Sequence, residues 1–142
     1  MVVWTIAISQ VNEGRVDREL LDEFRRGCEI TAETNQLNSL ATAEYRWGSY
    51  EVAIEDAKNA IEAEKNKSGG LASLAMSMFG SGDSKPHPSN YALLAMCYHR
   101  LKDSKNAKAQ LDLFNAAFES SSDSIRNECD FFTQELNSMT IQ

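Results

Sequence analysis

The chain has 142 residues, enough for one domain with one core, and its 42% hydrophobic and 25% charged residues exclude wholesale disorder. The net charge of -7 argues against a nucleic-acid partner, because phosphate binding needs a concentrated positive field. Two prolines and seven glycines are few, which favours helices over short strands with many turns.

The cysteines and the hydropathy pattern indicate the cellular compartment of the chain. Cys28, Cys97 and Cys129 are odd in number and form no C-x-x-C pair, so they predict neither a disulfide framework nor a thiolate zinc site. The apolar start "MVVWTIAIS" lacks a basic flank, and no segment reaches the roughly 18 to 20 apolar residues that cross a bilayer. We therefore expect a cytoplasmic protein that binds no membrane.

Residues 1–33 are expected to form the first and most degenerate of three helix pairs, with a turn near 12–15. Its apolar positions are Trp4, Ala7, Ile8 and Val11, followed by Leu20 and Phe24. Val2, Val3 and Trp4 would leave an apolar edge exposed if Met1 is the true start. Three alternatives stay open for this edge: the chain was cut from a longer protein, the edge meets a partner or a second copy, or it is a frayed tail folded over the first helix pair.

Residues 34–67 predict a helix, a tight turn at Gly48 and an antiparallel helix. The apolar positions before the turn are Leu37, Leu40, Ala41 and Tyr45, and those after it are Ala53, Ile54, Ala57, Ala60 and Ile61. The segment 51–64 carries five acids and one lysine. A solvated outer helix face explains these acids, and an acidic docking patch is the alternative.

Residues 66–87 are expected to be an insertion between the second and third pairs. Leu71, Leu74, Ala75, Met78 and Phe79 have helical spacing and predict a short amphipathic helix between glycine- and serine-rich hinges. This face packs against the neighbouring repeats in one interpretation. In the other it is a mobile lid or a docking helix for another chain.

Residues 88–121 predict the third pair, and residues 123–139 a capping helix. The interval from Leu37 to Tyr91 equals the interval from Ala53 to Ala107, so both helices of the third pair keep the register of the second. Ser122 or Asp123 is expected to cap the N-terminus of this helix, which buries one face. That face comprises Ile125, Cys129, Phe132, Leu136 and Met139.

The three pairs resemble the tetratricopeptide repeat, whose pattern is W-x2-L-G-x2-Y followed by A-x3-F. The matching segments are Trp4-x2-Ala7-Ile8-x2-Val11 with Leu20-x3-Phe24, Leu37-x2-Leu40-Ala41-x2-Glu44 with Ala53-x3-Ala57, and Tyr91-x2-Leu94-Ala95-x2-Tyr98 with Ala107-x3-Leu111. The closing proline of the repeat is absent from all three. The resemblance implies one all-α domain over 1–142, a right-handed α-α superhelix of about three antiparallel helix pairs with a C-terminal cap.

The second and third units are also similar to the tetratricopeptide segments of large bacterial serine/threonine protein kinases and WD-repeat proteins. The sequence has no Gly-rich phosphate loop and no HRD or DFG triplet. This resemblance therefore implies an accessory region related to something larger, not a kinase domain.

In tetratricopeptide arrays the first helix of each pair lines a concave surface, so the resemblance implies a peptide-binding groove. Its candidate residues are Asn35, Asn38, Thr42, Tyr45, Arg46, Met96, His99 and Arg100. Arg46 and Arg100 occupy the same place in their repeats, and two such arginines in an acidic protein suit a peptide carboxylate or acidic side chains. The alternative is that each arginine pairs with a nearby Glu44 or Glu51.

The sequence offers little for catalysis. Cys97 and His99 are two residues apart, which on a helix points their side chains roughly 200 degrees apart and prevents a nucleophilic Cys/His pair. His87 and His99 are not spaced with other metal ligands, so no metal, cofactor or catalytic residue is predicted. We expect a non-catalytic scaffold that binds a protein or peptide. The alternative is a regulatory or oligomerisation region of a larger bacterial enzyme such as a protein kinase, with a homodimer formed through the N-terminal edge or through residues 71–79.

Overall fold

The computed structural model describes residues 18–31, 34–68 and 85–141, and all regular elements within these ranges are α-helices. They are α2 (Arg18–Thr31), α3 (Thr34–Trp47), α4 (Tyr50–Ser68), α6 (Pro88–Arg100), α7 (Ser104–Glu119), α8 (Asp123–Glu128) and α9 (Asp130–Ser138). The predicted all-α class is confirmed for the part of the chain that is described.

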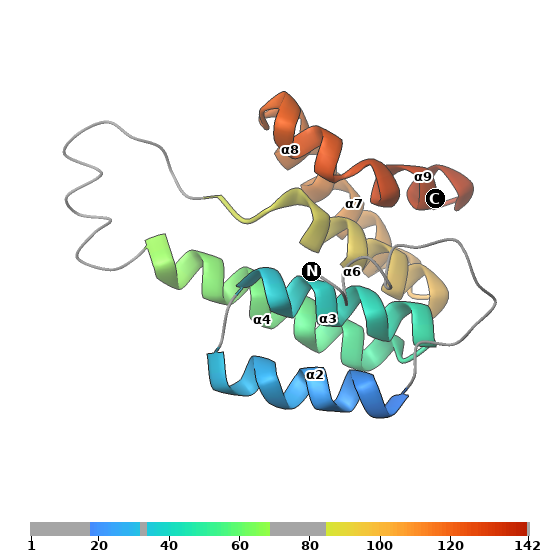
Figure 1. Cartoon of the computed structure of the whole chain (residues 1–142). Coiled ribbons are helices and arrows are strands. Elements are labelled where there is room, and N and C mark those ends of the chain that lie inside the picture. The colour runs from blue at the N-terminus through green and yellow to red at the C-terminus, as the bar shows by residue number, and fades with distance from the viewer. Residues whose placement is uncertain (1–17, 32–33, 69–84, 142) are drawn as a thin grey trace, which may run out of the picture.

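Helix α6 is the centre of the molecule. It contacts α3, α4, α7 and α9, and most of its residues are buried. The helices α3 and α4 form one antiparallel pair and α6 and α7 form another, while α2 packs on α3 and the α8–α9 segment lies on the opposite side of the molecule (Figure 1). The first helix of one pair therefore packs on both helices of the preceding pair.

The two pairs close through equivalent turns. Gly48 (φ 96°) and Lys102 (φ 62°) both have left-handed backbone conformations, and the interval between them is the one that separates Leu37 from Tyr91. In each turn the next backbone N–H bonds the carbonyl oxygen five positions earlier, at an N···O distance of 2.9 Å in both cases. These bonds occupy carbonyls that the helix end leaves unpaired. The register found in the sequence is thus present in the backbone of both turns.

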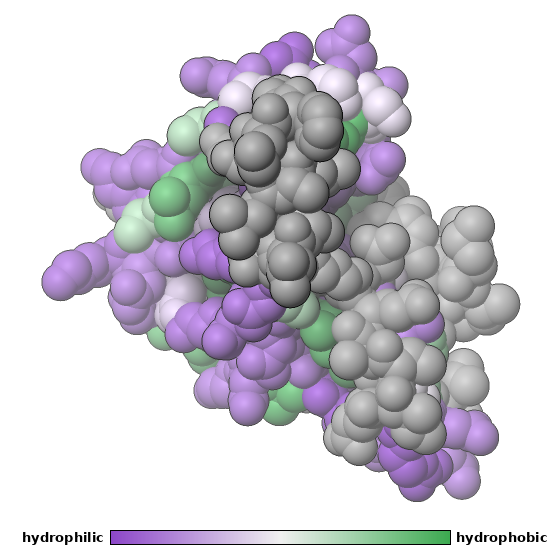
Figure 2. All heavy atoms as spheres, turned by 90° about the vertical axis from the view of Figure 1, so that its left-hand side faces the viewer, coloured by the Kyte–Doolittle hydropathy of each residue, from purple (hydrophilic) through white to green (hydrophobic). Residues whose placement is uncertain are grey.

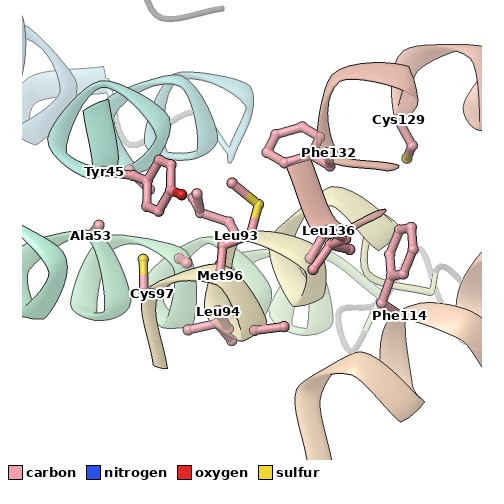
Figure 3. Packing of buried hydrophobic residues seen from close by; sticks show 14 of the residues in the cluster. Tyr45, Ala53, Leu93, Leu94, Met96, Cys97, Phe114, Cys129, Phe132 and Leu136 are labelled. Carbon is pink, nitrogen blue, oxygen red and sulfur yellow. The ribbon is translucent and has the colours of Figure 1, made fainter. Parts of the chain in front are cut away.

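The core lies between the two pairs and extends to α9 (Figure 3). Small residues bring the helix backbones close together, and the fully buried alanines of this core cluster come from three helices. They are Ala41 of α3, Ala53 and Ala57 of α4, and Ala92 and Ala95 of α6. Leu93, Met96 and Phe132 fill the remaining space as fully buried large side chains. This packing explains why the apolar stripes of the second and third pairs are readable in the sequence.

Helix α2 is joined to α3 and α4 by a partly buried charge network. Arg25 donates to both oxygens of Asp56 at 3.0 and 2.8 Å and to Glu44 at 2.8 Å, and Arg18 donates to the other Glu44 oxygen at 2.7 Å. A small apolar cluster of Leu21, Leu40 and Ala43 packs beside it. The sequence pattern did not predict this network.

The predicted capping helix is wrong in one respect: the structure has two helices, α8 and α9, that meet at Cys129. The Cys129 N–H bonds the Arg126 oxygen at 3.0 Å, a tight three-residue return that ends α8. The predicted N-cap is confirmed, since the Ser122 hydroxyl accepts the Ile125 N–H at 3.5 Å. The expected inner face is buried at Cys129, Phe132 and Leu136.

Several predictions fall outside the described residues: the N-terminal apolar edge, the first turn at 12–15 and the helix at 71–79. The insertion begins later than expected, because α4 continues through 66–68. Seen from the side where α4 ends and α6 begins, hydrophilic residues cover most of the coloured surface and hydrophobic ones show in separate patches (Figure 2).

Candidate protein-binding surface

Helices α3 and α6 lie side by side and share polar contacts at two levels. Near their starts, Asn38 donates to the Asn90 side-chain oxygen at 2.6 Å and to the Ser89 hydroxyl at 3.2 Å. Near their ends, the Arg100 Nε donates to the Tyr45 hydroxyl at 3.2 Å. The first helices of the second and third pairs are therefore aligned along their length.

Arg46 and Arg100 are both exposed at the ends of these two helices. The Arg100 guanidinium also lies 6.0 Å from the centre of the Tyr45 ring. The pKa of Arg100 is raised, mainly by its hydrogen bond to Tyr45, so this side chain is a permanent cation held in place. We call Arg46, Arg100 and the Tyr45 hydroxyl the arginine surface.

Three of the expected groove residues do not line an open surface. Thr42 and Met96 are fully buried, and Tyr45 is 5% exposed, with its hydroxyl bonded by Arg100. Thr42 donates its hydroxyl to the Asn38 carbonyl oxygen at 2.9 Å, within its own helix. These positions are buried because α3 and α6 pack directly against each other and α9 covers part of their contact.

The remaining candidates are Asn38, His99 and Asn35. Asn38 is half-buried and directs its amide at α6, so it joins the two helices instead of facing a ligand. His99 is half-buried, and Asn35 lies in α3 with a side chain outside the described set. Among the candidates whose side chains are described, Tyr45 and Arg100 are therefore in direct contact, and Arg46 is exposed at the end of the helix that carries Tyr45.

Glu44, one of the two alternative partners proposed for the arginines, is bound by other residues. Its side chain is 0% exposed, and its two oxygens are held by Arg18 and Arg25 of α2. Arg46 instead places its guanidinium 4.7 Å from the centre of the Phe131 ring, a cation–π distance. The charge on Arg46 is therefore in contact with α9.

Two residues of α9 belong to this surface and were missed in the sequence. Phe131 contacts Arg46, and the Glu135 carboxylate lies near enough to Tyr45 and Arg100 to raise the pKa of both, after the larger effects of burial on Tyr45 and of the Tyr45 hydrogen bond on Arg100. The signal was present: "DFFTQEL" is acidic and aromatic with no basic residue, which is complementary to two arginines.

Cys97 is held as a thiol. It is fully buried, and burial raises its pKa to about 12, with a smaller contribution from Glu51. A thiolate is the reactive form of cysteine, so this side chain is a poor nucleophile near neutral pH.

A Ser–His–Glu series occurs at the start of α6 and has the residue types of a hydrolytic triad. The Ser89 hydroxyl is 2.7 Å from His87 Nδ1, and His87 Nε2 is 3.1 Å from Glu128. Ser89, however, is only 3% exposed and also receives a hydrogen bond from Asn38, which leaves its hydroxyl no access to a substrate. His87 accepts the Ser89 N–H, so we interpret the series as the cap of α6.

The described ranges hold no candidate for a metal site or a membrane span. No group of three or more His, Cys, Asp or Glu side chains there is placed to hold a metal ion. None of the helices described is long and apolar enough to cross a membrane.

No family model matches the chain, and searches of curated proteins and of solved structures gave no significant match.

Proposed function

We propose that this chain is a non-catalytic protein-interaction module with a tetratricopeptide-like arrangement, and that its arginine surface binds acidic peptide segments. The observation that carries the proposal is the alignment of α3 and α6, which places Arg46 and Arg100 of successive repeats at the ends of two adjacent helices. Stacked helix pairs leave an extended surface of this kind, preformed for binding.

The packing order supports the tetratricopeptide-like arrangement. In such arrays each new helix pair must bury its apolar face on the preceding pair. Here α6 packs on α3 and α4, and the turns at Gly48 and Lys102 repeat at the same interval as the apolar stripes. This interval contains the long insertion, so the array tolerates extra residues between its pairs.

The chemistry of the surface supports an acidic ligand. Guanidinium groups match carboxylates with two parallel hydrogen bonds, and both arginines are exposed in a chain whose net charge is -7. The chain as a whole repels acidic partners, so binding depends on local cations. Arg100 is held by Tyr45, which reduces the rotamer entropy lost when a carboxylate binds.

The test uses fluorescein-labelled peptides rich in Asp and Glu, each with a free or amidated C-terminus, and fluorescence polarisation. The double variant Arg46→Ala/Arg100→Ala should weaken the best peptide at least about ten-fold, since charged hydrogen bonds contribute about 1.5–3 kcal/mol each. The matched control is Lys105→Ala/Lys108→Ala, which removes two exposed cations of α7 and should keep the affinity.

Thermal unfolding of each variant separates binding from folding. A double arginine variant that unfolds at the wild-type temperature and has lost peptide binding supports the proposal. Equal peptide affinity in the two double variants contradicts it.

A further inference from the structure

Helix α9 occupies the side of α3 and α6 that the repeat arrangement leaves for a ligand. Phe132 is fully buried and Leu136 is 7% exposed, and both belong to the same apolar cluster as Tyr45 and Met96. In Figure 3 the Phe132 ring points toward the part of the cluster that holds Tyr45 and Met96. Met96 was expected to face a ligand, and the apolar face of α9 now helps to cover it.

The charges of α9 also match this surface. Its segment "DFFTQELNS" has two acids and no basic residue. Phe131 lies under the Arg46 guanidinium at 4.7 Å. The pKa of Arg100 is raised first by its hydrogen bond to Tyr45 and further by the nearby Glu135 carboxylate. An acidic amphipathic helix is therefore already seated against Arg46, and it carries an acid near Arg100.

The helical state of α9 depends on this contact. It has nine residues, and its N-cap residue Cys129 makes no side-chain capping bond. Helices shorter than about 12 to 15 residues are marginal in water without tertiary packing. A break at Cys129 separates α9 from α8, so α9 is not an extension of a longer stable helix.

We infer that α9 is an intramolecular ligand of the arginine surface, and that the partner is an acidic amphipathic helix of another protein that displaces it. The partner helix carries the same anchors as α9: two adjacent aromatic residues, an acid three positions after the second and a leucine directly after the acid. This inference rests on the proposed function and specifies its ligand. A tethered helix competes at a millimolar effective concentration, so the wild-type chain binds a free helix weakly.

The experiment uses the full chain and a fluorescein-labelled peptide of residues 128–140 that carries Cys129→Ser. The chain variant Glu135→Arg replaces the acid that lies near Arg100 with a cation and weakens the docking of α9, while the peptide keeps its acid. We expect the peptide to bind this variant about five-fold more tightly than wild type, the factor that corresponds to about 1 kcal/mol. Asp112→Arg on the exposed face of α7 is the matched control, with the same net charge and no change to α9.

Two further readouts protect the interpretation. Circular dichroism shows that the Glu135→Arg chain is folded, and a peptide carrying Phe132→Ala should lose its binding to it. The inference is overturned if Glu135→Arg and Asp112→Arg bind the peptide equally, or if the Phe132→Ala peptide binds as well as its parent. It is also overturned if light scattering shows Glu135→Arg to be a dimer, because a second copy would then be the occupant.

These outcomes are distinguishable from failure of the proposed function. If other acidic peptides bind the wild type and lose affinity in Arg46→Ala/Arg100→Ala, the proposed function stands even when the α9 peptide result overturns the inference. If no acidic peptide binds either folded chain, both fail.

Discussion

Replacing Arg25 with alanine should destabilise the chain by leaving buried carboxylates without their cation. The Glu44 and Asp56 side chains are 0% and 7% exposed, whereas Arg25 itself is 26% exposed. Removing one partner of a buried ion pair costs about 3–5 kcal/mol, and we expect the lower end, about 3 kcal/mol, because Arg18 still binds Glu44 and water can enter where Arg25 was.

The cost should also depend on pH. Burial raises the pKa of Asp56, and Arg25 opposes that increase. Without Arg25 the folded-state pKa is raised further, so the folded chain holds a proton that the unfolded chain releases between the ordinary and the raised value. Stability therefore rises as pH falls through this window, and the penalty of Arg25→Ala should be smaller at pH 5 than at pH 8.

Urea unfolding followed by circular dichroism at both pH values measures this penalty. Arg26→Ala is the control, because Arg26 lies next to Arg25 on α2 but is exposed. In an Arg25→Ala background, Asp56→Ala should cost less than it does alone, since it removes an unpaired buried charge. Strictly additive effects, or an Arg25→Ala penalty equal to that of Arg26→Ala, would refute the reasoning.

Three other predictions concern single residues. Gly48→Ala should lower the free energy of unfolding in urea by about 1 kcal/mol, because a left-handed backbone (φ 96°) strains a residue with a Cβ. Gly27→Ala within α2 should raise it by about 0.5–1 kcal/mol. Equal effects of the two substitutions would contradict the turn geometry. Cys97 should resist iodoacetamide at pH 8 in the native chain and react in urea, as read by peptide mass spectrometry, because burial raises its pKa to about 12. Hydrogen bonds from Asn106 lower the pKa of Asp103, so the stabilisation by this helix cap is present at neutral pH and is lost in acid. Between pH 7 and pH 3 the Asp103→Asn variant should therefore lose less stability than the wild type. An equal loss in the two chains would exclude this cap as the cause.

The fold was predictable at positions where the residue type favours one backbone conformation or one environment. Gly48 ends a helix because glycine tolerates a left-handed backbone, and the apolar stripes on both sides of it recur in the same register around Lys102. The break at Cys129 was not predictable, since Cys129 is itself part of the apolar stripe and is buried in the structure. The charge network was hidden for a different reason: Glu44 breaks an apolar pattern, but its cations come from α2, and pairing across helices leaves no periodic signal.

The exposure of the candidate residues was predictable for the two arginines and not for the positions that are buried. Repeat register shows which face of a helix a residue occupies, and it placed Arg46 and Arg100 at equivalent exposed positions. Register does not show what covers that face. Thr42 and Met96 lie where α3, α6 and α9 pack closely, so a tertiary contact that no single helix encodes decides their burial.

The position of α9 illustrates a limit of amphipathic patterns that also has a functional consequence. The stripe at Phe132 and Leu136 shows that α9 buries one face, but any apolar surface of suitable size satisfies such a stripe. The selection of the α3–α6 side depends on contacts that lie outside the stripe, above all that of Phe131 with the Arg46 guanidinium, with the Glu135 carboxylate as a nearby charge. Because these contacts involve few residues on a short helix, another chain with the same few residues can reproduce them. The small number of contacts outside the apolar stripe therefore has two effects. It hides the docking site of α9 from sequence analysis, and it allows another helix to replace α9.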